Sequence, residues 1–470
     1  MIIMTDKELF EMLSYDRKNV YDEITEDEQR EMNTICEDYK NFLSAAKTER
    51  ECVKEAVKLA EKNGFVLISS KSELNAGDKI YMINRNKNIF LAVIGSDSME
   101  DGINIVGAHI DSPRLDLKQN PLYEKTDMAF LKTHYYGGLK KYQWTALPLA
   151  IHGVVMTKDG AKEICIGEHD DDPVFCITDL LPHLAKDQMS KKMTEGIEAE
   201  NMNLLIAGMP IKADDVKERV KFAVLKLLNE KYGMVERDFQ TAEIEIVPAG
   251  RARDVGLDRS LVGSYGQDDR VCAYTTLRAI FEIDAPKKTA VAFLADKEEI
   301  GSMGNTGSQS AFMEMCIAEM MEKASGSCSI TGYNRAIRNS ACMSSDVSAA
   351  VDPNYENVHE MMNATFAGKG VAIMKYTGAR GKYDSSDAGA EFVNEIARIM
   401  DDNEIIWQTG ELGKIDQGGG GTIAQYVANL NMDVIDCGVP VLSMHSPFEV
   451  TAKSDIYMAY KAYMAFYRNR

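Results

Sequence analysis

Two adjacent carboxylates, Glu298 and Glu299, follow the apolar run 289–294 and begin a turn that contains Gly301. Neighbouring side chains on an extended segment point in opposite directions, so two consecutive glutamates seldom perform the same task. A turn that directs both into one cavity lets one bind a metal ion while the other transfers protons. By itself, however, such a pair is more typical of a solvated acidic loop.

Other polar residues also lie beside apolar or helical segments. His109 and Asp111 are two apart at the end of the run 103–111, so on a strand they face the same way. This spacing suits a histidine ligand and a carboxylate that orients its ring. Taken singly, Asp268 is a candidate helix N-cap, Asp346 a candidate turn cap and His445 a packed core histidine.

These residues together favour a different interpretation. Two histidines and three carboxylates at separate strand ends form a plausible paired-metal site with mixed nitrogen and oxygen ligands. Two divalent ions about 3.5–4 Å apart need a bridging carboxylate, and one histidine and one further carboxylate each. Glu298, next to a ligand, is then the candidate general base for an attacking water, which is a hydrolase arrangement. The candidate ligands are His109, Asp268, Glu299, Asp346 and His445.

The elements that must position these residues follow a strand–loop–helix rhythm. Residues 5–62 have helical spacing, and strands are expected at 79–84 and 88–94 and within 103–111. The C-terminal part predicts strands at 289–294, 341–345, 370–375, 404–407, 433–436 and 440–444. It also predicts helices at 269–283, 310–324, 386–401, 421–429 and 453–467. This alternation indicates an α/β sandwich with ligands at the strand ends.

The middle of the chain has a different texture. Between residues 112 and 240 prolines and glycines interrupt short strand-like pieces, and none of the candidate clusters falls there. We expect a second domain inserted into the first, with the return near 243–248. The predicted division is therefore 1–111 with 241–470 as one domain and 112–240 as the insertion.

Composition narrows the class of protein. The chain has 470 residues, of which 45% are hydrophobic and 27% charged, as in globular proteins. A net charge of −20 disfavours nucleic acid and anionic membranes as partners. Nine dispersed cysteines without a C-x-x-C pair indicate reduced thiols. Because neither a signal peptide nor an apolar stretch of about 18 residues is evident, we expect a cytoplasmic protein.

The motifs GAHIDSPRLDLK, GQDDR, ADKEEIGSMGNTGSQS, SSDVSAAVDPNYE and MHSPFE occur in this order. They resemble the aspartyl aminopeptidase family of di-zinc exopeptidases, which includes the vacuolar aminopeptidase I type and bacterial homologues. The resemblance extends from about residue 10 to the C-terminus. It implies a three-layer α/β/α sandwich catalytic domain of the zinc-exopeptidase type with an inserted, β-rich dimerisation domain. It also implies an aminopeptidase that acts on peptides with a free N-terminus.

The resemblance further implies a role for each motif residue. His109 and Asp346 would hold one metal ion, Glu299 and His445 the other, and Asp268 would bridge them. Two zinc ions are expected, although cobalt or manganese would suit the same ligands.

Two neighbouring carboxylates receive the remaining roles. Asp111 would orient His109, and Glu298 would be the general base. The Asp268–Asp269 peptide bond would be cis.

The inserted segment resembles a domain that, in relatives, forms dimers and packs subunits into a tetrahedral dodecamer. By this resemblance His183 is a candidate to reach a neighbouring subunit's active site. Lys375 is a candidate to pair with an acidic substrate side chain. The glycine-rich sequence from Lys375 to Asp387 departs from the eukaryotic aspartyl type, so an acidic, a neutral and a broad preference all stay open.

Two alternatives compete with the aminopeptidase. A related di-metal deacylase or carboxypeptidase-type amidohydrolase would use the same ligands but recognise a carboxylate, and its extra domain would be inserted nearer the C-terminal ligands. Here the long gap lies between His109 and Asp268, which favours the aminopeptidase. A non-catalytic scaffold on the same fold predicts missing ligands or a missing base, but every expected position is filled.

Overall fold

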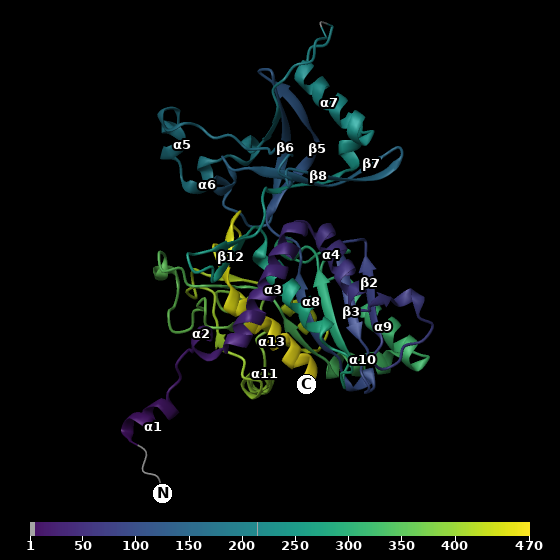
Figure 1. The fold of residues 1–470 in the computed structure, drawn as a ribbon, viewed down its shortest axis with the longest axis vertical. Helices are drawn as coiled ribbons and strands as arrows, with labels where there is room; N and C mark the ends of the chain where they lie inside the picture. Colours follow the sequence, from purple (N-terminus) through teal and green to yellow (C-terminus); the bar gives the residue numbers. More distant parts are fainter. Residues whose placement is uncertain (1–4, 214) are drawn as a thin grey trace.

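The computed structural model describes residues 5–213 and 215–470, which form a main body and a smaller lobe (Figure 1). Within these residues the body is built on a nine-stranded mixed sheet. β4 lies near its centre and runs parallel to β13 on one side and β14 on the other. The strand order is β1 (Val66–Leu67), β2 (Lys79–Asn84), β3 (Asn88–Val93), β13 (Ala290–Ala295), β4 (Asn104–His109), β14 (Ala341–Ser344), β20 (Asp433–Gly438), β16 (Val371–Met374) and β18 (Trp407–Thr409).

Helices cover both faces of this sheet and make two separate cores. On one face pack α3 (Glu26–Ala45), α4 (Glu49–Lys62), α8 (Gln267–Phe281), α11 (Ala390–Asp402) and α13 (Lys453–Asn469). On the other pack α9 (Phe312–Ser325), α10 (Ile330–Asn339) and α12 (Ala424–Ala428). Strand residues alternate between the cores: Ala292 and Leu294 belong to the first and Phe293 to the second. The predicted three-layer α/β/α sandwich is confirmed.

Local sequence accounts for the helix ends. Thr25 caps α3 in a reciprocal capping box with Glu28, and α4 ends at Lys62, followed by Asn63 and Gly64. Gly64 has a φ of +84°, a conformation that favours glycine.

Three predicted elements differ from the structure. The strand expected at 404–407 begins only at Trp407, because residues 403–405 form the turn that ends α11, with backbone bonds back to Met400 and Asp401. The helix expected at 421–429 is limited to α12, and α10 was not predicted. The apolar run 440–444 supplies a short strand, β21 (Pro440–Leu442), in a different sheet. That five-stranded sheet has the order β11 (Arg253–Val255), β12 (Leu261–Ser264), β22 (Glu449–Ala452), β21 and β15 (Ser348–Ala349).

The smaller lobe contains a six-stranded antiparallel sheet against which α7 (Arg219–Tyr232) packs (Figure 1). The order is β8 (Gly160–Ile166), β7 (Leu149–Thr157), β10 (Glu243–Pro248), β5 (Arg114–Lys125), β6 (Met128–Tyr136) and β9 (Leu204–Ala207). It has its own core around Trp144 and Ile246, as the β-rich insertion requires. Because β10 pairs with β5 and β7, this sheet extends past the predicted boundary at residue 240. We propose that the chain returns to the body after residue 248.

The remaining α-helices and β-strands of the described residues are short. They are α1 (Asp6–Leu13), α2 (Val20–Glu23), α5 (Lys186–Ser190), α6 (Met193–Gly196), and the paired strands β17 (Gly378–Ala379) and β19 (Gly419–Gly420). Among the helices of the described residues, we find none that is both long and apolar enough to cross a bilayer.

Candidate metal centre

The five predicted ligands meet beside the ends of the central strands. They form two groups of three, and within each group the donor atoms lie within 4.8 Å of one another. Asp268, at the start of α8, belongs to both groups. One group adds His109 and Asp346, and the other adds Glu299 and His445.

The distances within the two groups are similar. Nε2 of His109 lies 3.1 Å from Oδ1 of Asp268 and 3.7 Å from Oδ1 of Asp346. Nε2 of His445 lies 3.1 Å from Oδ2 of Asp268 and 3.6 Å from Oε1 of Glu299. Carboxylates only accept hydrogen bonds when ionised, so each of the two 3.1 Å nitrogen–oxygen contacts needs either a proton or a cation between its atoms. Imidazole with carboxylate oxygens is a donor set that suits zinc and similar divalent ions.

The electrostatics of the cluster also fit a cation. Burial raises the pKa of Glu298 to about 8, and nearby carboxylates add to this effect. Burial likewise raises the pKa of Glu299 well above its usual range. Among the described atoms, Oε1 of Glu299 is buried without a hydrogen-bond partner. Buried oxygens that repel one another are costly unless a positive charge lies between them, so the residues present fit divalent ions.

Asp111 supports this centre through contacts with the His109 ring and with the turn that carries Glu298 and Glu299. Its Oδ1 lies 3.3 Å from Nδ1 of His109 and accepts the backbone N–H of Glu298 at 3.1 Å. Its Oδ2 accepts the backbone N–H of Glu299 at 3.2 Å. Asp111 therefore contacts the His109 ring, as expected, and also holds the turn that carries both glutamates, which was not predicted.

Glu449 is a second supporting carboxylate that sequence reasoning missed. Oε1 accepts the backbone N–H of His445 at 2.7 Å, and Oε2 accepts that of Asp268 at 3.0 Å. The residue is 1% exposed. Its place in the MHSPFE motif was a signal, although the sequence does not say what it contacts. The Asp268–Asp269 peptide bond is cis, as the resemblance implied.

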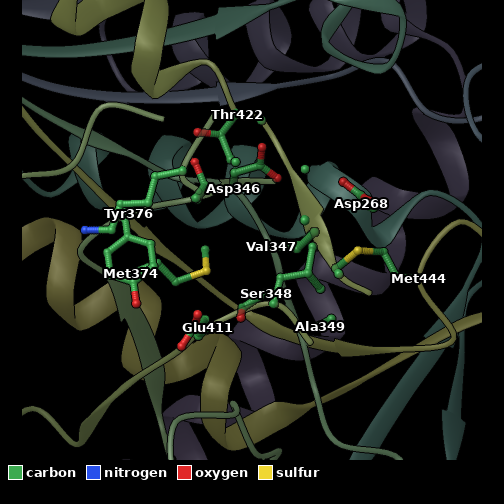
Figure 2. Close-up of a pocket in the computed structure, with 18 of the residues that line it drawn as sticks. Asp268, Asp346, Val347, Ser348, Ala349, Met374, Tyr376, Glu411, Thr422 and Met444 are labelled. Atoms are coloured by element: carbon green, nitrogen blue, oxygen red, sulfur yellow. The ribbon is translucent and has the colours of Figure 1, made fainter. Parts of the chain in front are cut away.

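A cavity of about 230 Å³ opens beside the ligands. Figure 2 shows Asp268 and Asp346 at one part of its wall and Tyr376 and Glu411 at another. Glu298 also lines it, and its Oε2 lies 3.9 Å from Nε2 of His109. A carboxylate that faces both the cavity and a ligand is positioned to exchange protons with a bound reactant.

Two predicted site residues lie elsewhere. Lys375 lines a neighbouring depression with Trp407, and its Nζ is 3.6 Å from Oδ1 of Asp387. His183 lies on the exposed 3₁₀ turn Pro182–Leu184, outside both ligand groups. The basic residues that line the cavity are instead Arg380 and Lys382, together with His445.

An α/β sandwich that gathers histidine and carboxylate ligands beside a cavity defines a metallohydrolase. A family model described as "Aminopeptidase I zinc metalloprotease (M18)" matches residues 42–467. The chain belongs to this family, and the resemblance inferred from its motifs is confirmed. It is an aminopeptidase, a zinc metalloprotease that removes N-terminal residues, and not one of the alternatives that competed with it.

Relatives that match over nearly their whole length also carry the name M18 aminopeptidase. The chain is 51% identical to a probable M18 family aminopeptidase 1 of Clostridium acetobutylicum, over 96% of this chain and 98% of the relative. It superposes on the crystal structure of an M18 aminopeptidase from Thermotoga maritima with a TM-score of 0.94 and 45% identity, covering 97% of this chain and 100% of the other. The S. cerevisiae mApe1 dodecamer is 18% identical, with a TM-score of 0.74 over 92% and 96% of the two chains. That likeness establishes the shared fold alone.

Proposed function

We propose that this aminopeptidase uses two metal ions, with His109 and Asp346 holding one, Glu299 and His445 holding the other, and Asp268 bridging them. The observation that carries the proposal is the pair of three-residue donor groups that share Asp268. Zinc is the expected metal, and the same donors accept cobalt or manganese. When bound, the ions would polarise the scissile carbonyl and lower the pKa of a nearby water.

The chain's own residues then carry the proton transfers. Glu298, on the cavity wall, takes a proton from the attacking water and later delivers it to the leaving amine. Asp111 holds the Glu298–Glu299 turn through two backbone N–H groups, so both carboxylates keep their orientation. The free α-amine of the substrate lies on the Glu299 side.

The first substrate residue would occupy the cavity. Met374 and Tyr376 supply apolar surface there, while Glu411 and Arg380 supply opposite charges. Lys382 also lines the cavity, but its charge is already paired, since its Nζ is 3.0 Å from Oδ2 of Asp387 and lies 4.0 Å from the centre of the Tyr376 ring. This balance supports a neutral or broad preference over a strictly acidic one.

We also propose a homo-oligomer built from dimers, up to a tetrahedral dodecamer. The dodecamer of mApe1 supports it, as do the exposed apolar side chains of the smaller lobe, Leu181, Leu184, Met189 and Met193. His183, which lies outside the ligand groups of its own chain, would reach the active-site cavity of a neighbouring subunit. Sedimentation analysis tests the assembly.

The dispersed free cysteines support a reducing, cytoplasmic location. The expected partners are peptides rather than nucleic acid or membranes.

The two-metal proposal is tested with purified protein stripped by EDTA and restored with zinc or cobalt. We expect hydrolysis of aminoacyl anilides to return in step with the second equivalent of metal, and N-acetylated anilides to stay intact. Full activity with one equivalent would contradict the two-ion assignment. Equal cleavage of the acetylated substrate would show that a free amine is not recognised.

A further inference from the structure

One short segment of the smaller lobe reaches the metal centre from outside the body. β6 ends at Tyr136, and Gly137 and Gly138 follow it. The hydroxyl of Tyr136 donates to Oδ2 of Asp111 at 2.8 Å. The carbonyl oxygen of Gly138 lies 2.8 Å from Nδ1 of His445. We call residues 136–138 the orienting segment. It contacts Asp111, the carboxylate beside His109, and it contacts the ring of His445 directly.

The contact at Gly138 determines which ring nitrogen of His445 carries the proton. A carbonyl oxygen only accepts, so Nδ1 must donate, and in the neutral ring that binds a metal ion the lone pair is then on Nε2. Nε2 is the atom that faces Asp268 and Glu299. A histidine that donates its other N–H to a carbonyl is a recurring arrangement among metal ligands, because it fixes both tautomer and ring orientation.

The contact at Tyr136 acts on His109 through Asp111. Nδ1 of His109 hydrogen-bonds to the backbone carbonyl oxygen of Asp111 at 3.1 Å and lies 3.3 Å from Oδ1 of the same residue. Oδ1 accepts the Glu298 N–H, while Oδ2 accepts the Glu299 N–H and the Tyr136 hydroxyl. Removing the hydroxyl would leave Oδ2 with one of its two described donors. The buried carboxylate could then rotate, which would change its contact with the His109 ring and loosen the Glu298–Glu299 turn that it holds.

Tyr136 is itself held in place. The guanidinium of Arg114 lies 3.9 Å from the centre of the Tyr136 ring, and the two residues are register partners in β5 and β6. Arg114 is buried and is held by Asp116 at 2.8 Å, Glu245 at 3.3 Å and Glu49, from helix α4 of the body, at 3.4 Å. A stacked and buried ion network therefore restricts the phenol to one position.

Gly137 permits this close approach. Its φ is +73°, and a Cβ added there would lie 3.3 Å from Oε2 and 3.3 Å from Cβ of Glu299. A side chain at this position would therefore press on a proposed ligand as well as strain the backbone.

We infer that the orienting segment positions both histidine ligands, with Tyr136 as a positioning residue for the metal centre. The smaller lobe then contributes to the centre within its own chain, separately from any part it takes in assembly. This inference rests on the proposed ligand set.

The test is Tyr136→Phe, measured by zinc titration of the EDTA-stripped protein and by the visible spectrum of the Co²⁺-loaded form. We expect zinc affinity to fall about 10–100-fold and the Co²⁺ absorption to change, because the ligand geometry loosens. Tyr81→Phe is the matched control, since its hydroxyl also donates to a carboxylate, that of Glu61, at 2.8 Å. Tyr81→Phe should bind zinc as the wild type does, and circular dichroism of the metal-free variants checks their folding.

A reference variant separates this inference from the ligand set. If His109→Ala loses metal while Tyr136→Phe keeps wild-type affinity and spectrum, the orienting segment has no such role and the ligand set stands. If His109→Ala retains the full metal content, the ligand set is wrong and the inference falls with it.

Discussion

His109 and His445 place their Nε2 atoms at the same distance, 3.1 Å, from the two different carboxylate oxygens of Asp268. The two histidines come from distant parts of the chain, one at the end of β4 and the other just after β21. A single carboxylate between them can serve two cations only if both of its oxygens are free to bind.

This relationship predicts a large effect of Asp268→Asn. The amide is isosteric, but it lacks the charge and presents an NH₂ group to one histidine. We expect loss of both equivalents of zinc, whereas Asp346→Asn should lose one equivalent. Atomic emission analysis of dialysed protein measures the stoichiometry. Two equivalents retained by Asp268→Asn would be incompatible with a bridging role.

Glu298→Gln separates proton transfer from metal binding. The amide cannot accept the proton of the attacking water, so kcat should fall by about 10²–10⁴-fold, while both zinc ions stay bound. The measurement is steady-state hydrolysis of an aminoacyl anilide alongside metal analysis. Glu319→Gln, on the exposed face of α9, is the control and should behave as wild type. Undiminished turnover of Glu298→Gln would mean that another group is the base.

Glu449→Gln tests the carboxylate that joins two ligand-bearing segments. The substitution replaces one of its two acceptor oxygens with an NH₂ donor, and this donor then faces the backbone N–H of either His445 or Asp268. An unpaired buried donor costs about 1–3 kcal/mol, so urea unfolding of the metal-free protein should occur at a lower midpoint. Glu61→Gln removes a carboxylate acceptor at the surface and serves as control. An unchanged midpoint would show that the two hydrogen bonds accepted by Glu449 do not contribute to stability.

His152 links the smaller lobe to the body and predicts a pH dependence. Its Nδ1 is 2.7 Å from Oε1 of Glu51 in α4, and its Nε2 is 3.0 Å from Oε1 of Glu168, which also pairs with Lys47 at 2.6 Å. Burial lowers the pKa of His152, but hydrogen bonds with Cys165, Glu168 and Glu51 outweigh it and raise the pKa to about 11. Both ring nitrogens face carboxylates, so the ring is a cation in the folded protein.

The sign of the effect follows from linkage. The unfolded histidine has a pKa of about 6.5, so the stabilisation is complete below that pH and is lost as pH rises towards 11. Burial raises the pKa of Glu51, but the hydrogen bond and charge of His152, together with backbone N–H donors of Lys47 and Thr48, outweigh burial and lower the pKa. The contribution of Glu51 is therefore lost instead below about pH 4.5. Between pH 7 and 10 the free energy of unfolding should therefore fall by up to about 1.4 kcal/mol per pH unit from His152. His152→Gln should remove this part of the slope in the metal-free protein, and parallel slopes for variant and wild type would contradict the assignment.

Much of the centre could be predicted because its residues lie in contiguous motifs at the ends of apolar runs. Strand ends of a parallel sheet meet at one edge, so His109, Glu299 and Asp346 could be expected together without knowing any distance. The substrate-binding hypothesis for Lys375 has no such geometric basis. A lysine after a strand can turn in several directions, and here it lies beside Asp387.

The amino-acid sequence by itself determined the layers of the fold and the types of ligand, because hydrophobic periodicity and short motifs are local properties of the chain. Only the tertiary structure decided what supports those ligands. Tyr136, Gly138 and Glu449 are ordinary residue types whose importance arises from contacts between segments far apart in sequence. The hydrogen bonds that orient a metal ligand depend on distances of a few tenths of an ångström, and these are set by packing across sheets rather than by any pattern along one strand.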